Sequence, residues 1–133
     1  MHRFIVTVSS SSREELIDVT DELRAIAKRH STAKLMSLFS KGATSAVMIQ
    51  ENWDPQIRQD ILDCLKNVAP NGVWRHDKID GNADAHIKSG IVGPSETLPL
   101  DNGELMLGQW QNVFFCDFDG PRSRRELIVT LYP

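Results

Sequence analysis

The chain has 133 residues, of which 41% are apolar and 25% charged, and this balance fits one hydrophobic core in a single domain over residues 1–133. No run approaches the ~20 apolar residues of a membrane-spanning helix, and the first residues do not form a signal peptide. A net charge of −3 argues against a general nucleic-acid binder, whose affinity rests on neutralising phosphates. We therefore expect a cytoplasmic protein with neither nucleic-acid nor membrane partners.

The first half of the chain predicts strands interrupted by two helices. Alternating apolar residues predict a strand over 2–9, and strands over 34–40 and 43–50 flank a turn at Lys41-Gly42. Ser12 and Glu15 form a capping-box pattern that predicts a helix there, with an apolar face of Leu16, Val19, Leu23 and Ile26. Asp54 and Pro55 predict the start of a second helix. Its expected buried stripe is Ile57, Ile61, Leu62, Leu65 and Val68.

The second half is richer in strands and turns. Residues 81–93 permit a short helix, and strands are predicted over 95–100, 104–108, 109–118 and 124–132. In the last strand, Leu127, Val129 and Leu131 should face one side. These elements predict an α+β sandwich on a largely antiparallel sheet. Cys64 and Cys116 have no C-x-x-C partner, so we expect two buried thiols in place of a disulfide or a zinc site.

Three polar segments could carry chemistry. In the first, DGNADAH, the side chains of Asn82 and His86 converge in either a strand or a helix, and a nearby WRHD run adds His76. Two imidazoles with carboxylates suit a divalent cation or acid–base catalysis, although the spacing matches no standard metal signature. The alternative is a hydrogen-bonded polar loop without a ligand.

The second and third segments are DFDGPRSRR at 117–125 and QENWD at 50–54. Arg122, Arg124 and Arg125 follow a turn, where alternate guanidiniums suit a phosphate or protect a solvated strand edge. Asp54 is explained as a helix cap, whereas Glu51 and Asn52 have no such structural role. Trp110 and Gln111 could line a pocket, and Trp110 could equally belong to the core.

The runs ATSAVMIQENWDP, VWRHD, GNADAHIKSGIVGPSETLPL and LGQWQNVFFCDFDGPRSR are similar to the YjbQ family of secondary thiamine-phosphate synthase enzymes. The resemblance implies a YjbQ-like mixed β-sandwich with two main helices, assembled as a homotrimer. It also implies that the polar segments meet in one pocket. The implied catalytic residues are His76, His86, Asp84 and Glu51. The implied substrate-binding residues are Asn52, Asn82, Lys88, Gln111, Asp119, Arg122 and Arg124.

The implied reaction joins a pyrimidine methyl pyrophosphate to a thiazole phosphate and releases pyrophosphate. Arginines and Lys88 would hold phosphate oxygens, helped by Mg²⁺ on Asp84 or Glu51. His76 and His86 are the candidate ligands of a divalent cation, Mg²⁺ or Zn²⁺. This chain has Gly42-Ala43-Thr44-Ser45 where many members have a His-Thr-Thr-Ala run, so one imidazole is missing. Two alternatives follow: a non-catalytic trimeric binder of a small phosphorylated or anionic metabolite, or a metal-assisted phosphate-ester hydrolase.

Overall fold

The computed structural model describes residues 1–133, which form two antiparallel sheets and three α-helices. The larger sheet has five strands in the order β1-β8-β3-β5-β6, and the smaller has three in the order β2-β7-β4. Every ladder between neighbouring strands is antiparallel. The strands are β1 (His2–Val8), β2 (Glu15–Asp18), β3 (Leu35–Ser40), β4 (Ser45–Gln50), β5 (Ser95–Asp101), β6 (Glu104–Leu105), β7 (Asn112–Asp117) and β8 (Arg125–Tyr132).

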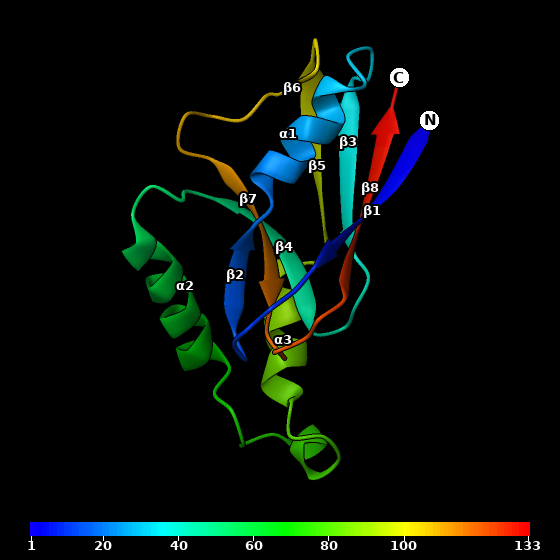
Figure 1. The fold of residues 1–133 in the computed structure, drawn as a ribbon. Helices are drawn as coiled ribbons and strands as arrows, with labels where there is room; N and C mark the ends of the chain where they lie inside the picture. Colours follow the sequence, from blue (N-terminus) through cyan, green and yellow to red (C-terminus); the bar gives the residue numbers. More distant parts are fainter.

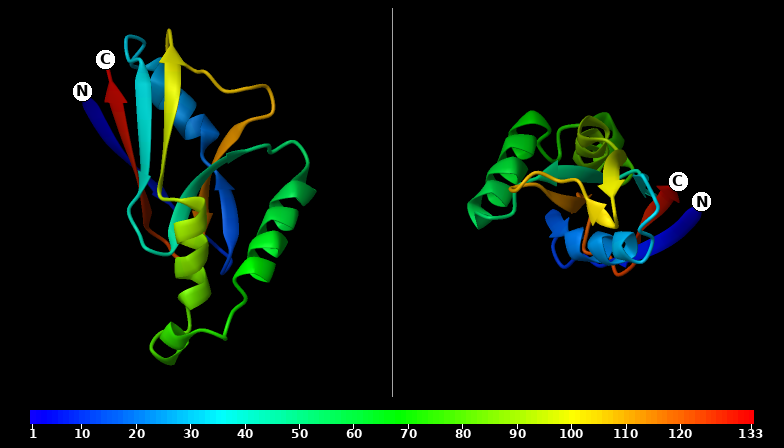
Figure 2. Two further views of the ribbon diagram at one scale, coloured as in Figure 1. Left: turned by 180° about the vertical axis from the view of Figure 1, so that it is seen from behind. Right: turned by 90° about the horizontal axis from the view of Figure 1, so that it is seen from above.

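The helices lie on opposite sides of these sheets. Helix α1 (Thr20–Lys28) packs on one side, and α2 (Pro55–Val68) and α3 (Ala83–Val92) lie on the other, as the view from above in Figure 2 shows. A 3₁₀ helix, η1 (Arg75–Lys78), connects the last two. None of the helices is both long and apolar enough to cross a membrane.

The core has two parts, one on each face of the small sheet, whose strands β2, β7 and β4 are labelled in Figure 1. The larger part lies between the two sheets and is closed by α1, where Leu23 and Ile26 pack. Residues Leu127, Val129 and Leu131 of β8 all point into it, as the alternation predicts. The smaller part lies between the opposite face of the small sheet and the helices α2 and α3. The predicted α+β class in a single compact domain is confirmed.

The predicted helix beginning at Ser12 is wrong over its first half. Glu15 does reach back to accept hydrogen bonds from the backbone N–H groups of Ser11 (2.8 Å) and Ser12 (3.3 Å), as a capping box requires. However, the chain then enters β2, because Glu15–Asp18 pairs with Phe114–Asp117 of β7. Helix α1 starts only at Thr20. All four residues of the expected apolar face are nevertheless buried.

Two burial predictions in the second helix are also wrong. Helix α2 begins at Pro55 with Asp54 as its N-cap, as predicted, and the Asp54 carboxylate accepts from the N–H of Gln56. Within its expected stripe only Leu65 is buried, Ile61 and Leu62 pack partly buried beside it, and Val68 is 57% exposed. Cys64 of the same helix is also exposed, whereas Cys116 of β7 is buried.

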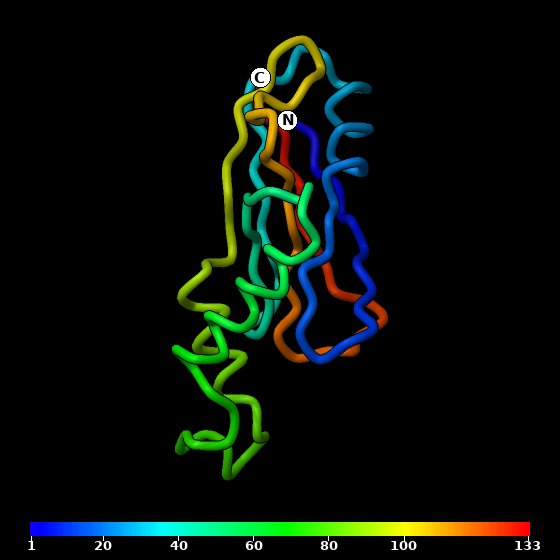
Figure 3. Tube along the Cα trace, turned by 90° about the vertical axis from the view of Figure 1, so that its left-hand side faces the viewer, coloured from blue at the N-terminus to red at the C-terminus, as the bar shows by residue number.

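The segment between α2 and α3 carries the predicted polar residues outside the sandwich. Figure 3 shows this segment, in green, projecting beyond the ends of the strands. Helix α3 confirms the short helix permitted over 81–93, and it packs on β4. The hydroxyl of Ser89 donates to the backbone oxygen of Ser45 (2.6 Å) and fixes the helix to that strand. His76 and His86 are thereby held at the end of the molecule where β4 begins.

Candidate functional site

The imidazole rings of His76 in η1 and His86 in α3 pack edge to face. The ring centroids of His76 and His86 are 5.1 Å apart, and the rings are perpendicular. The Nε2 atom of His76 is buried and has no hydrogen-bond partner, although a carboxylate oxygen of Asp80 lies 3.7 Å away. The pair opens on a hollow of about 340 Å³ that is lined by Trp74, His76, Ala83, His86 and Ile87. An aromatic, apolar hollow with two imidazoles suits a small heteroaromatic ring.

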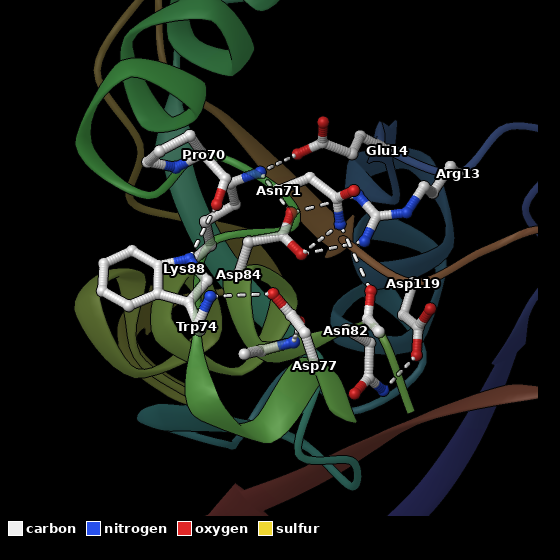
Figure 4. A network of polar contacts seen from close by, with 12 residues as sticks. Arg13, Glu14, Pro70, Asn71, Trp74, Asp77, Asn82, Asp84, Lys88 and Asp119 are labelled. Carbon is white, nitrogen blue, oxygen red and sulfur yellow. Dashed lines mark hydrogen bonds and ion pairs between the residues drawn. The ribbon is translucent and has the colours of Figure 1, made fainter. Parts of the chain in front are cut away.

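The carboxylate of Asp77 holds η1 against the start of α3. One of its oxygens accepts from the N–H of Trp74 and the other from the N–H of Ala83, both at 3.0 Å. The indole of Trp74 in turn donates to the backbone oxygen of Pro70 (2.7 Å), as Figure 4 shows. These bonds position His76 opposite His86. Sequence reasoning missed this role of Asp77, although an acidic residue three positions after the N-cap of a helix, here Trp74, is a capping signal.

Asp84 lies at the centre of a buried ion-pair network (Figure 4). Its carboxylate accepts from both terminal nitrogens of Arg13 (2.9 and 3.1 Å), from Asn71 (3.0 Å) and from Lys88 (3.0 Å). Burial alone would raise the pKa of Asp84, but the hydrogen bonds from Arg13, Asn71 and Lys88 outweigh it and hold the pKa far below its usual range. The carboxylate is fully enclosed, so its contacts are all with the protein.

Lys88 belongs to the same network. Its side chain is 1% exposed, and its ammonium donates to Glu14 (2.7 Å) as well as to Asp84. The two carboxylates hold this buried ammonium in place. The network therefore ties the loop before β2 to α3, and Lys88 supports the site from within the protein.

A second chain of contacts leads from α3 to the predicted arginines. The amide of Asn82 donates to Asp119 (2.9 Å), and Asp119 accepts from Arg122 (3.2 Å). The other amide atom of Asn82, Oδ1, is buried and has no partner. Arg122 and Arg124 are both exposed. The structure thus brings Asn82, Asp119 and Arg122 to the same end of α3.

Three predicted residues lie elsewhere. Glu51 follows the far end of β4, roughly 20 Å from Ser45 at about 3.3 Å per strand residue. It borders another hollow, of about 480 Å³, with Gln50, Trp53 and Trp110. Asn52 donates to Asp18 (2.6 Å), and Gln111 accepts from the N–H of Gly108 (2.8 Å), so both amides stabilise local structure. Trp110 is 55% exposed and lies outside the core.

The residues of one chain do not fit a catalytic divalent metal. His76 and His86 provide two donors, whereas a catalytic zinc site takes three protein ligands. No group of three or more His, Cys, Asp or Glu side chains gathers anywhere in the chain in a way that could hold a metal. Asp84, the nearest buried carboxylate of α3, is already engaged by Arg13 and Lys88.

Comparisons with known proteins converge on one family. Residues 5–133 match the family model of the UPF0047 proteins, described as YjbQ-like. The UPF0047 protein MJ1081 of Methanocaldococcus jannaschii is 37% identical over 129 residues, which cover 96% of this chain and 92% of that protein. The UPF0047 protein YugU of Bacillus subtilis is 36% identical over 121 residues, covering 88% of this chain and 89% of that protein.

Solved structures agree with this fold. A YbjQ-like protein of unknown function from Sulfolobus solfataricus superposes with a TM-score of 0.93 at 31% identity, covering 98% of this chain and 95% of that chain. A conserved hypothetical protein from Thermus thermophilus superposes with a TM-score of 0.88 at 34% identity, covering 96% of this chain and 98% of that chain.

Proposed function

Since the chain belongs to the UPF0047 family of YjbQ-like proteins, we propose that it binds a small phosphorylated heteroaromatic metabolite at the His76–His86 pair and has weak thiamine-phosphate synthase activity. The observation that carries the proposal is the pair itself. Two imidazoles meet at 5.1 Å beside a hollow of about 340 Å³, and one ring nitrogen has no partner in the protein.

The shape and lining of this hollow suit a pyrimidine-sized ring. Its volume falls in the range of about 300–1,000 Å³ that is usual for small-molecule sites. Trp74, Ala83 and Ile87 provide apolar walls, which would slow the attack of water on a reactive pyrimidine-methyl carbon. The ring nitrogens of His76 and His86 can each donate or accept a hydrogen bond at the edge of a heteroaromatic ring.

In the proposed reaction the C–O bond between the pyrimidine methylene and pyrophosphate breaks, and pyrophosphate leaves with the electron pair. The thiazole nitrogen then forms a C–N bond to the methylene carbon and gives thiamine phosphate. A protonated imidazole of the pair would donate its proton to the departing oxygen. Arg122 and Arg124 are exposed and would contact phosphate oxygens. Lys88 and Asp84 would position α3 through their buried network.

Binding without catalysis is the second candidate. Asp84, which the family resemblance implies as a catalytic residue, is fully buried and bonded to three side chains, so it is not free to handle a proton or a metal. The metal-assisted hydrolase is less well supported, because one chain offers only two imidazole donors.

The decisive experiment compares product formation from the pyrimidine pyrophosphate and thiazole phosphate in wild type, His86→Ala and His2→Ala. His86→Ala removes an acid–base imidazole and should lower the rate by about 100-fold or more. His2→Ala, at an exposed histidine, is the matched control and should leave the rate unchanged. Circular dichroism melting checks that each variant folds.

Calorimetry with the pyrimidine pyrophosphate separates the two candidates. If wild type forms no product but binds this ligand, and His86→Ala weakens the binding, the protein is a binder. If His86→Ala binds as tightly as wild type, the ligand does not contact this pair and the site assignment is wrong.

A homotrimer is also part of the proposal. Ile5 (60% exposed) pairs in register with Ile128, which pairs with Phe39 (44% exposed), so an apolar row crosses the outer face of the large sheet. Exposed apolar rows of this kind are typical of protein interfaces. Light scattering should give three times the 15.0 kDa mass of one chain, and a monomer mass would contradict the proposal.

A further inference from the structure

The turn between β3 and β4 offers several hydrogen-bond donors that the protein does not use. The backbone N–H groups of Gly42, Ala43 and Thr44 donate to no other group of the chain. Thr44 is buried, so its N–H cannot be freely solvated like an exposed one. Successive unpaired N–H groups in a turn form a concave surface that favours anions.

A buried guanidinium points at the same turn. The side chain of Arg125 is 9% exposed, and its Nε and Nη2 atoms donate to Asp117 and to the hydroxyl of Thr44. Its Nη1 atom makes no hydrogen bond within the protein. This nitrogen lies 3.3 Å from where a Cβ atom would stand on Gly42. Arg125 therefore has one donor left over, directed at the turn.

Gly42 keeps that donor uncovered. Its backbone does not adopt the left-handed conformation that would require glycine. A Cβ atom here would instead stand 2.9 Å from the hydroxyl of Ser45, which is hydrogen-bonded to Ser40 at 2.5 Å. Because Gly42 has no side chain, the space in front of Nη1 of Arg125 stays open. The backbone dihedral angles of Gly42 do not by themselves require glycine.

The space in front of the turn leads to His86. A hollow of about 590 Å³ has Lys41, Gly42 and Ala43 on one wall and His86, Ser89 and Gly90 of α3 on the other. His86 also borders the hollow of the imidazole pair, so it stands between the two. Lys41 adds a positive charge that is only loosely paired, with 3.8 Å between its ammonium and the Glu126 carboxylate.

We infer that the β3–β4 turn, with Nη1 of Arg125 and the ammonium of Lys41, is an oxyanion site that binds the phosphate group of a phosphate ester. Backbone N–H groups and a guanidinium are the donors that phosphate takes in proteins. That this phosphate belongs to the ligand of the imidazole pair rests on the proposed function. The site itself stands on its own donors.

A titration with inorganic phosphate tests the inference, followed through the amide resonances of the protein by NMR. In wild type, the resonances of Gly42, Ala43 and Thr44 should shift saturably. The double variant Gly42→Ala/Ser45→Ala adds a Cβ over Nη1 and removes the hydroxyl it would strike. Because a charge-assisted hydrogen bond is lost, its phosphate affinity should fall by about 10-fold or more.

Two controls accompany this variant. Ser45→Ala alone leaves the turn open, and Lys34→Gln removes an equivalent charge at the other end of β3, so both should bind phosphate within about two-fold of wild type. Unchanged binding in the double variant, or shifts that do not centre on residues 42–44, would overturn the inference. Intact phosphate shifts with no product formation would sink the proposed transfer reaction and leave the oxyanion site standing.

Discussion

The carboxylate of Asp84 connects the loop before β2, Asn71 in the turn between α2 and η1, and helix α3. It accepts from Arg13, Asn71 and Lys88 and has no exposed surface. Asp84→Asn removes the charge and leaves the buried ammonium of Lys88 with Glu14 alone. We predict a loss of about 3 kcal/mol in the free energy of unfolding, because removing one partner strands a buried charge. Urea unfolding at pH 7 measures this loss.

The matched control is Asp60→Asn. Asp60 lies on α2, is exposed and takes part in no ion pair, so its substitution should change stability by less than about 0.5 kcal/mol. Equal unfolding midpoints for the two variants would mean that the Asp84 network adds nothing to stability.

Individual polar residues were predicted better as a group than by role. Asn82, Asp84 and His86 all lie in the first turns of α3, but their side chains contact Asp119, the Arg13–Lys88 network and His76, respectively. The pairing of Asp84 with Arg13 could not be predicted, since Arg13 is 71 positions away and nothing local marks it. Sequence alone cannot tell which of the arginines at 122, 124 and 125 turns inward, and in the structure it is Arg125, which is buried beside Asp117.

At the scale of single elements, the predicted and the observed buried faces of helix α2 differ. Its periodic apolar residues predict one buried stripe, yet only Leu65 is buried and Val68 is 57% exposed. We predict that Leu65→Ala costs about 2–4 kcal/mol of unfolding free energy and that Val68→Ala costs less than about 0.5 kcal/mol. Thermal or urea unfolding of the two single variants measures both. If Val68→Ala costs as much as Leu65→Ala, α2 lies in a different orientation from the one described.

The strand β2 shows where local signals lose to pairing. Glu15 does accept the capping hydrogen bond from the N–H of Ser12. However, residues 15–18 pair with β7 as a strand, and this pairing buries Leu16 on the small sheet. Tertiary contacts of this kind override local propensity. Strands whose two faces differ clearly, such as β8, were predicted correctly because alternation depends on the residues of that strand alone.

At the scale of the whole molecule, the antiparallel α+β architecture could be predicted, and the meeting of distant segments could not. Turn signals between short alternating runs predict antiparallel strands. They do not reveal that β8 lies between β1 and β3, or that Glu51 and His86 end up at opposite ends of β4. The single pocket implied by the family resemblance therefore requires more than one chain if Glu51 is to belong to it.

Three buried or half-buried carboxylates join these distant segments. Asp18 links β2 to Asn52 and to Asn112 at the start of β7, Asp84 links the loop before β2 to α3, and Asp117 links β7 to Arg125 of β8. Burial would raise the pKa of each, but hydrogen bonds from the partner side chains outweigh it and lower all three.

These lowered pKa values predict how stability depends on pH. An aspartate whose pKa is lower in the folded than in the unfolded chain contributes stability above the unfolded value of about 3.9 and loses it as the pH falls toward the folded value. The urea midpoint should therefore stay level between about pH 7 and 5 and then drop steeply below about pH 4. Asp84→Asn should show a shallower drop, because one of the three linked protons is gone, whereas Asp60→Asn should keep the wild-type slope. A wild-type midpoint that stays level down to about pH 2.5 would show that these carboxylates are not what holds the two sheets and α3 together.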